Sequence, residues 1–416
     1  MKHNKILVSE YINFTVVCLI FLPGINNFIN TIFQVGFSIE IKTITPSVYI
    51  FMMLLGLGSY WLCLRYKVTF LLLALVIVIG TLVSYIKYPV IRQVIYNNPV
   101  DLIYNDVNKL LFFCIPLLYL SYFIKDFENL FKDMVKWARI NILLGLVAII
   151  IIQFIRGKSL QYMVYSYFML IPICVCFESY RNYRYKFDVL LSIIGVFAIL
   201  ITGARGAIIS LGLYLFFRFF LPNKKNKNVR NFVSIIIAMM TLLLIFINFE
   251  NILIFATRLL EQFNISSRFV TSLLNSSLTL SIGRDLIRSA IFTGLSYRPF
   301  FGYGLYGDRF ITGTYGYNSY SYSHNIFLEI LSYFGYLLGG LLIIIFIRQL
   351  YMLFRSEKDK YFSSVLFSIL PYGLFQLFFS GSMLTNILFF MLCGLMLSHK
   401  NSTKKQSRAV KKILCS

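Results

Sequence analysis

Residues 325–347, NIFLEILSYFGYLLGGLLIIIFI, decide the fold class of this chain. The stretch carries one acidic side chain, Glu329, and is long enough to cross about 30 Å of hydrocarbon as an α-helix. Similar apolar runs recur along the chain, and only helices and closed barrels satisfy their backbone groups inside lipid. The pattern predicts an all-α polytopic membrane protein with about 12 transmembrane helices, at residues 11–23, 45–64, 68–86, 108–124, 140–155, 162–178, 187–202, 206–221, 232–248, 325–347, 362–380 and 382–398.

The charge distribution predicts how these spans are oriented. The chain has 416 residues, of which 58 % are hydrophobic, and a net charge of +23. If the N-terminus is cytoplasmic, 26 of the 39 lysines and arginines fall in short inner-side segments, as the positive-inside rule requires. Both termini are therefore predicted to be cytoplasmic, with a basic tail at 399–416. The basicity sets topology and does not indicate nucleic acid as a partner. We expect one integral membrane domain, 1–416.

The largest predicted non-membrane segment is an outer-face loop at about 249–323. We expect amphipathic helices at 250–263 and 281–295 within it, and shorter outer loops at 24–44 and 87–107. No inner-side segment is large enough for a nucleotide-sugar or ATP site, and the Walker A and DxD patterns are absent. Any chemistry is expected at the membrane or outside it, on a substrate already delivered.

Three patterns in the sequence are interpreted as structural. Gly302, Gly304 and Gly307 spell G-x-G-x-x-G, but they neither follow a strand nor open a βαβ unit, so they predict turns. Gly335 and Gly339 predict the close approach of another helix. The seven cysteines lack metal-ligand spacing. No metal and no cofactor is expected.

The outer loop is unusual because its basic residues are all arginines. A guanidinium pairs bidentately with phosphate oxygens, so the bias predicts an anionic ligand at the outer leaflet. The alternative is snorkelling, or pairing with Glu250, Glu261, Asp285 and Asp308. Arg284 and Arg288 are four residues apart and share a helix face from which Asp285 is expected to point away. The outer-side arginines are Arg205, in a tight link between two spans, and Arg258, Arg268, Arg284, Arg288, Arg298 and Arg309.

His324 is the histidine placed to act on the outer side, because His3 and His399 lie beside the basic termini. Near pH 7 a neutral imidazole could take a proton from a sugar hydroxyl, whereas an imidazolium could contact phosphate. Asn325 and Glu329 share a helix face, and His324 and Glu329 do not. Glu329 could also orient an arginine. Flat tyrosines, including Tyr322, suit the faces of sugar rings and also a membrane interface.

Three strings in this region resemble the bacterial O-antigen polymerase and O-antigen ligase family, the Wzy-type or Wzy_C superfamily. The string at 202–207, TGARGA, is similar to the family's small-residue-plus-arginine link. Gly283-Arg284, followed at 298–304 by RPFFGYG, resembles its GR and P-x-x-G-x-G pattern, and SHNIFLE at 323–329 resembles its HN-x-x-L string. The resemblance covers about 190–398. Arg288 departs from it, since many members carry an aromatic residue there.

The resemblance implies a metal-independent, inverting glycosyltransferase of GT-C-like architecture in the bacterial cytoplasmic membrane. Its donor is an undecaprenyl-diphosphate-linked oligosaccharide in the outer leaflet. His324, Arg205 and Arg284 are then the catalytic residues, with Arg288, Arg298, Asn325, Glu329 and Tyr322 binding pyrophosphate or glycan. Membrane lipid and a chain-length regulator protein are the expected partners.

Four functions are considered. The first is a repeat-unit polymerase, and the second is a ligase that transfers the finished glycan to lipid A core. The third is a lipid-linked oligosaccharide flippase, which should carry charges inside its central spans; here they are almost free of charge. A glycosyltransferase with an acidic base in its first outer loop has Glu40 available, but Lys42 lies close by and no second acid follows.

Overall fold

A computed structural model describes residues 2–37, 44–66, 69–87, 106–152, 163–202, 204–220, 282–315, 322–355 and 359–398. Every secondary-structure element in these ranges is a helix. The predicted spans at 232–248 and the predicted helix at 250–263 lie outside them, as do most of the loops at 87–107 and 249–323 and the basic tail. The helices are α1 (Lys2–Thr31), α2 (Ile44–Tyr66), α3 (Thr69–Lys87), α5 (Ile115–Phe123), α6 (Phe127–Ile150), α7 (Met163–Tyr183), α8 (Lys186–Thr202), α9 (Arg205–Phe220), α13 (Ile282–Tyr297), α14 (Gly307–Thr314), α15 (Ile326–Arg355), α16 (Lys360–Leu370) and Ile387–Ser398.

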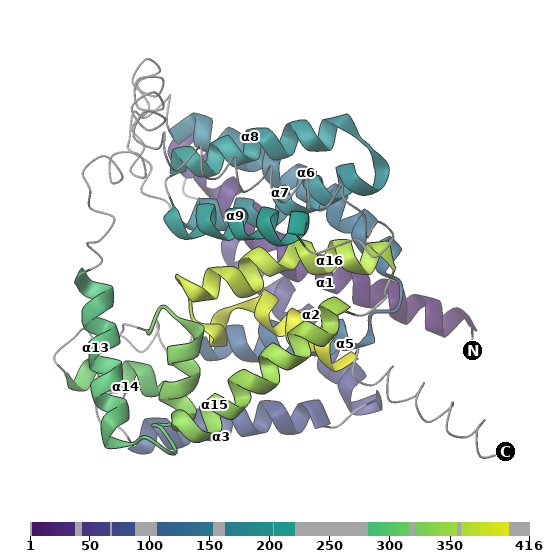
Figure 1. Ribbon diagram of the computed structural model, residues 1–416. Helices are drawn as coiled ribbons and strands as arrows, with labels where there is room; N and C mark the ends of the chain where they lie inside the picture. The colour runs from purple at the N-terminus through teal and green to yellow at the C-terminus, as the bar shows by residue number, and fades with distance from the viewer. Residues whose placement is uncertain are drawn as a thin grey trace.

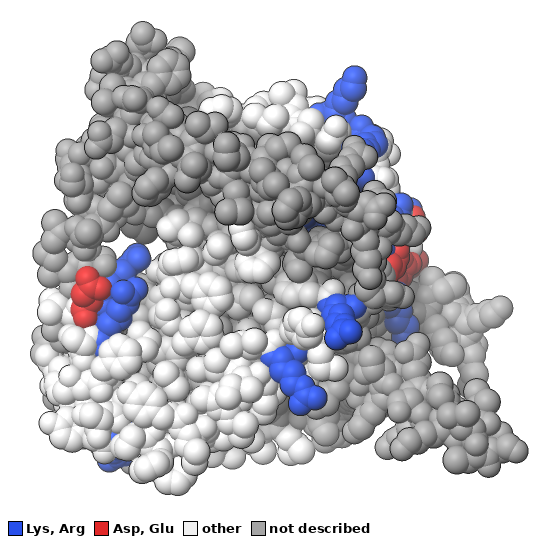
Figure 2. Space-filling model, viewed as in Figure 1, with Lys and Arg blue, Asp and Glu red and all other residues white. Residues whose placement is uncertain are grey.

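The helical membrane character predicted from the sequence is confirmed in part. Four of the described helices are long and apolar enough to cross a membrane, namely Val8–Gly36, Thr45–Leu62, Ile326–Arg355 and Lys360–Phe378. Shorter apolar helices accompany them. Large apolar side chains on α3, α8 and α15 point away from the protein interior, as expected for surfaces in contact with lipid. Figure 2 shows a broad uncharged area on this face, with charged side chains near α13 at the left and basic ones toward the C-terminal part of α15.

The first helix corrects one prediction. The chain does not enter a loop at residue 24, because α1 continues through Pro23 to Thr31 and on through a π-helical segment, Ile32–Gly36. Proline is tolerated inside a membrane helix where neighbouring groups satisfy the backbone. Here the amide of Asn141 on α6 donates to the carbonyl of Phe21, at 3.2 Å. Gly24 leaves the space that Asn141 occupies.

The start of α6 also differs from the prediction. The sequence predicts this span at 140–155, but the helix begins at Phe127. Asp126 caps it by accepting a hydrogen bond from the backbone amide of Asn129, at 3.0 Å. The added turns are amphipathic, with Lys132 and Lys136 exposed and paired with acids three and four residues away. A search for apolar runs therefore misses them.

Buried ion pairs join α6, α7, α8 and α9 at one end of the helices. Asp188 is fully buried and is paired by Arg139 through two hydrogen bonds, of 2.7 and 2.9 Å. Glu178 is fully buried and is paired by Arg218 at 2.6 Å. These residues come from segments predicted to meet at the inner side of the membrane. The structure therefore gathers the predicted inner-side segments at one end.

The α13–α14 unit lies at the opposite end (Figure 1). In that view α1, α8, α9 and α16 run roughly across the page, with the start of α1 at the right and α13 and α14 at the left. The predicted helix at 281–295 is confirmed as α13, Ile282–Tyr297. The fold thus separates the described part of the loop at 249–323 from the N-terminal end of α1.

Gly335 interrupts α15 and changes the interpretation of the Gly335–Gly339 pair. Its backbone, with φ 73° and ψ 179°, is one that glycine alone adopts readily. The break is filled by the 299–304 loop: Tyr303 and Gly304 donate their amides to the carbonyls of Ser332 and Tyr333, each at 2.9 Å. A side chain at Gly335 would collide with the backbone of the same loop. The close approach predicted here is made by a loop and not by a helix.

The turn interpretation of G-x-G-x-x-G is confirmed. Gly302 and Gly304 have positive φ angles of 62° and 84°, which glycine supplies without steric strain. The glycines of this string and Gly335 therefore form one structural unit, which fixes the end of α13 against α15.

Candidate functional site

Two of the three strings, at 283–284 and 323–329, come together at the end of the helices where α13 lies, and Gly206 of the third string lies there too, in the first turn of α9. Tyr167 on α7 lies at the centre. A side chain at Gly206, beside Arg205, would collide with the Tyr167 hydroxyl, and that hydroxyl is hydrogen-bonded to Ser380. The guanidinium of Arg284 lies close enough to Tyr167 and His324 to act electrostatically on both. We call Tyr167, Arg284, Tyr322, His324 and Tyr372 the tyrosine–histidine site.

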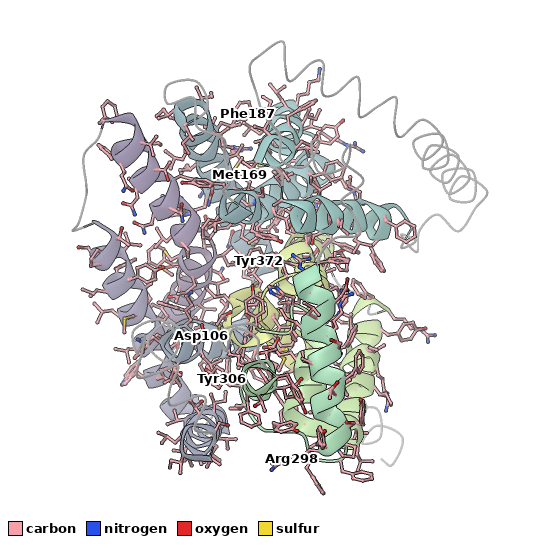
Figure 3. All side chains as sticks on the ribbon, turned by 90° about the vertical axis from the view of Figure 1, so that its left-hand side faces the viewer. Asp106, Met169, Phe187, Arg298, Tyr306 and Tyr372 are labelled. Carbon is pink, nitrogen blue, oxygen red and sulfur yellow. The ribbon has the colours of Figure 1, made fainter. Side chains whose placement is uncertain are left out.

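Aromatic rings line this site. The rings of Tyr167 and Tyr372 meet edge to face, with centroids 6.2 Å apart. The ring of Tyr322 lies against the imidazole of His324, with centroids 4.1 Å apart. Tyrosine rings offer flat apolar faces with a polar tip, which is the surface that sugar rings stack on. In Figure 3, Tyr372 lies near the upper end of α13, and Arg284 belongs to the first turn of that helix, which begins at Ile282.

His324 occupies an unusual backbone position. Its φ of 54° is in the left-handed region, which costs a non-glycine residue about 1–3 kcal/mol. The residues on both sides of His324 are held by hydrogen bonds. The backbone amide of Ser323 donates to the carboxylate of Asp308 at 3.0 Å, and the side chain of Asn325 caps α15. Strain of this kind persists where the surroundings enforce it, and it is concentrated at functional sites.

The imidazole of His324 is held neutral. Burial, assisted by the charge of Arg284, lowers the pKa of His324 to about 4. Its Nδ1 atom is buried and has no hydrogen-bond partner among the described residues. A neutral ring with a free nitrogen can accept a proton. The arrangement therefore favours the base over the phosphate-binding imidazolium, the two roles left open by the sequence.

The arginines predicted from the sequence do not all meet here. Arg284 is at the site, and Arg205 is the first residue of α9, next to Gly206. Arg288 is exposed and pairs with Asp285 at 3.3 Å, so the prediction that Asp285 points away is wrong; three residues on a helix are close enough for an ion pair. Arg298 lies fourteen residues beyond Arg284, about 21 Å along the helix, over the ring of Tyr303 (Figure 3).

Asn325 and Glu329 hold the structure together. The Asn325 side-chain oxygen accepts the amides of Phe327 and Leu328, at 2.9 and 3.2 Å, as the N-cap of α15. Glu329 is fully buried and accepts hydrogen bonds from Tyr333, Ser382 and the amide of Met383. It joins α15 to the segment before the last helix. Their predicted contact with substrate stays a prediction, and the structure gives both side chains other partners.

Sequence reasoning missed Tyr167 and Tyr372. Both lie inside apolar runs, where tyrosine is common and no motif marks it. One signal was available: the small residues at 202–207 indicate that another helix packs closely against this segment. In the structure that helix is α7, which carries Tyr167. Among the described residues, no group of three or more His, Cys, Asp or Glu side chains is arranged to hold a metal ion.

The fold and this site define a helical membrane protein with a histidine–arginine–tyrosine constellation at one end of its helices. Residues 190–345 match the family model Wzy_C, described as O-antigen ligase, and this confirms the resemblance that the three strings predict. The match indicates a function of O-antigen ligase or polymerase type, performed by glycosyltransferase-like enzymes. No curated protein and no solved structure matches the chain.

Proposed function

We propose that this protein is a polysaccharide repeat-unit polymerase. It transfers an undecaprenyl-diphosphate-linked glycan, at the outer leaflet of the bacterial cytoplasmic membrane, onto the non-reducing end of another lipid-linked repeat unit. In this proposal residues 1–416 form one membrane domain of about 12 spans with GT-C-like architecture. Both termini are cytoplasmic and the loop at 249–323 is outside.

The observation that carries the proposal is the convergence at the tyrosine–histidine site. Burial lowers the pKa of His324, and its Nδ1 atom has no hydrogen-bond partner among the described residues. Arg284 lies beside it, and α9 begins at Arg205 against Tyr167. A base, an arginine beside it and sugar-stacking tyrosines are groups that metal-independent transfer from a diphosphate donor requires, and the proposal adds Arg205, the first residue of α9, as a second arginine.

The reaction follows from these positions. His324 takes the proton of the acceptor hydroxyl, and the hydroxyl oxygen forms a bond to the anomeric carbon of the donor sugar from the face opposite the diphosphate. The bond between that carbon and the diphosphate oxygen breaks, with inversion at the carbon. Undecaprenyl diphosphate leaves with the electron pair. The guanidinium groups of Arg205 and Arg284 stabilise the charge that develops on it.

The second candidate is the ligase, which uses the same donor and the same site and differs in its acceptor, lipid A core. It is considered because the matching family model is described as O-antigen ligase. Deleting the gene and separating surface polysaccharide on a gel distinguishes the two. A single-repeat band on the lipid anchor indicates the polymerase, whereas loss of all surface-attached chain with polymer left on undecaprenyl diphosphate indicates the ligase. An unchanged ladder would contradict both.

The proposed topology has its own test. A cysteine placed at residue 270, in a chain without its native thiols, should react with a membrane-impermeant reagent in intact cells or spheroplasts. Labelling only after permeabilisation of the inner membrane would put the 249–323 loop, and with it the site, on the wrong side. Crosslinking in the same cells would reveal a chain-length regulator as a partner.

A further inference from the structure

A second polar cluster lies next to the tyrosine–histidine site and takes no part in the proposed chemistry. Its members are Asp106, Tyr306, Asp308, Arg309 and Tyr333. Asp308 is fully buried at the start of α14, and Arg309 is 5 % exposed. Figure 3 shows Asp106 and Tyr306 close to one another, below Tyr372 and beside α13.

Arg309 is the basic residue of this cluster. It donates to Asp106 at 2.6 Å and lies over the ring of Tyr306 at 4.7 Å. The carboxylate of Asp308 interacts with the same guanidinium. An unpaired carboxylate in this position would be strongly destabilising. Arg309, one of the arginines predicted to bind an anionic ligand, is therefore paired with Asp106 and lies within the electrostatic reach of Asp308.

Asp308 connects the cluster to His324. One oxygen of its carboxylate accepts the backbone amide of Ser323, at 3.0 Å, in a buried position. Ser323 also donates its hydroxyl to the carbonyl of Asn325, at 3.0 Å. The Asn325 amide group donates in turn to Phe378, at 3.4 Å. The left-handed turn at His324 is thus clamped from both sides, and Asp308 supplies the clamp on the N-terminal side.

We propose that Asp308 is a positioning residue. Through the amide of Ser323 it holds His324 in the left-handed backbone conformation that places the imidazole against Tyr322 and beside Arg284. Burial raises the pKa of Asp308, and the guanidinium of Arg309 opposes this effect. For catalysis the inference rests on the proposed function, but the placement of His324 can be measured without any substrate.

The test is the rate at which diethyl pyrocarbonate modifies each histidine in the purified full-length protein, followed by mass spectrometry of the peptides. Asp308→Asn keeps an oxygen that can accept the Ser323 amide, whereas Asp308→Leu has a similar size and no acceptor. We expect His324 in Asp308→Leu to react at least about 5-fold faster than in the wild type, because the imidazole is released from its half-buried position. In Asp308→Asn its rate should stay within about 2-fold. His3 and His399 are internal references whose rates should not change.

Folding and function are controlled separately. Asp308→Leu removes one of the two acids near Arg309. The double variant Asp308→Leu/Arg309→Met removes both charges, and it is used for the test if the single variant does not fold. In the double variant Asp106, which is 16 % exposed, can take up a proton. Asp133→Asn, on the exposed surface of α6, is the matched control. An unchanged His324 rate in Asp308→Leu or in the double variant overturns the positioning role, whatever reaction the protein performs.

Separate measurement of kcat and KM distinguishes a positioning role from general destabilisation. For folded Asp308→Leu, kcat should fall at least about 10-fold with KM for the donor little changed, since the base is misplaced while the arginines remain. A faster His324 rate with no transferase activity in the wild type would support the positioning and contradict the proposed function. Equal loss in Asp308→Asn and Asp308→Leu would indicate that charge, and not the bond to Ser323, matters.

Discussion

The pH dependence of activity tests the role of His324 most quantitatively. Burial and the neighbouring Arg284 lower the pKa of His324 to about 4, and a general base acts in its neutral form. With a pKa near 4 the neutral fraction is about 0.9 at pH 5, whereas with the ordinary value near 6.5 it is only about 0.03. Activity should therefore be maximal at pH values well above the pKa of His324 in the folded protein, and it should be lost as the pH falls through that pKa.

The assay is kcat/KM of the purified protein between pH 4.5 and 8.5, with the lipid-linked repeat unit as donor and acceptor, because kcat/KM reports the free enzyme. We expect activity to be nearly constant from pH 8 to pH 6 and more than half retained at pH 5. Arg284→Gln removes a positive charge from beside the imidazole, so the pKa of His324 should rise. The residual activity should therefore be lost at a higher pH than in the wild type. Half-loss near pH 6.5 in the wild type would refute the buried neutral imidazole. A rise in activity as the pH falls would indicate an imidazolium bound to phosphate.

Three further variants test other parts of the account. Arg205→Lys should be nearly as damaging to polymer length as Arg205→Ala, because the bidentate geometry is lost although the charge remains; near-normal polymer in the lysine variant would show that a point charge suffices. Gly335→Ala should lower the free energy of unfolding by at least about 1–3 kcal/mol, because the backbone conformation suits glycine and a side chain would collide with the 299–304 loop. Thermal unfolding in detergent measures this effect. Gly340→Ala is the control, because no atom lies within contact distance of a side chain added there. Glu329→Gln should keep both stability and activity, since its amide can match the donors and hydroxyls around it; a stable but inactive variant would restore the predicted contact with substrate.

The helical class was predictable because the length of the apolar runs is a local property of the sequence. His324 and Arg284, both singled out from the sequence, lie together in the structure, whereas Arg288 and Arg298 do not join them. Charge placement also anticipated that Arg139, Arg181 and Arg218 would gather at one end, where the structure pairs them with Asp188 and Glu178. These acids were not recognised as their partners, because an ion pair between helices depends on packing that no single segment encodes.

The sequence was less informative where tertiary contacts override local signals. Pro23 marked a predicted helix end, yet α1 continues through it, and Asn141 of α6 bonds to the backbone of the preceding turn at Phe21. Gly335 indicated a helix–helix contact, but the carbonyls freed by the break in α15 are satisfied by a loop. Tyr167 could not be predicted as the centre of the site, because its role arises only when α7, α9 and α13 meet.

Transfer by the purified protein tests the proposed function most directly. We expect the wild-type protein in detergent or liposomes, supplied only with an undecaprenyl-diphosphate-linked repeat unit, to form the two-repeat product and release undecaprenyl diphosphate. His324→Ala, inserted at normal abundance, should be slower by about 10²–10⁴-fold, the usual contribution of a general base. Product formed by His324→Ala at the wild-type rate, or no product from the wild type with either the repeat unit or lipid A core as acceptor, would contradict it.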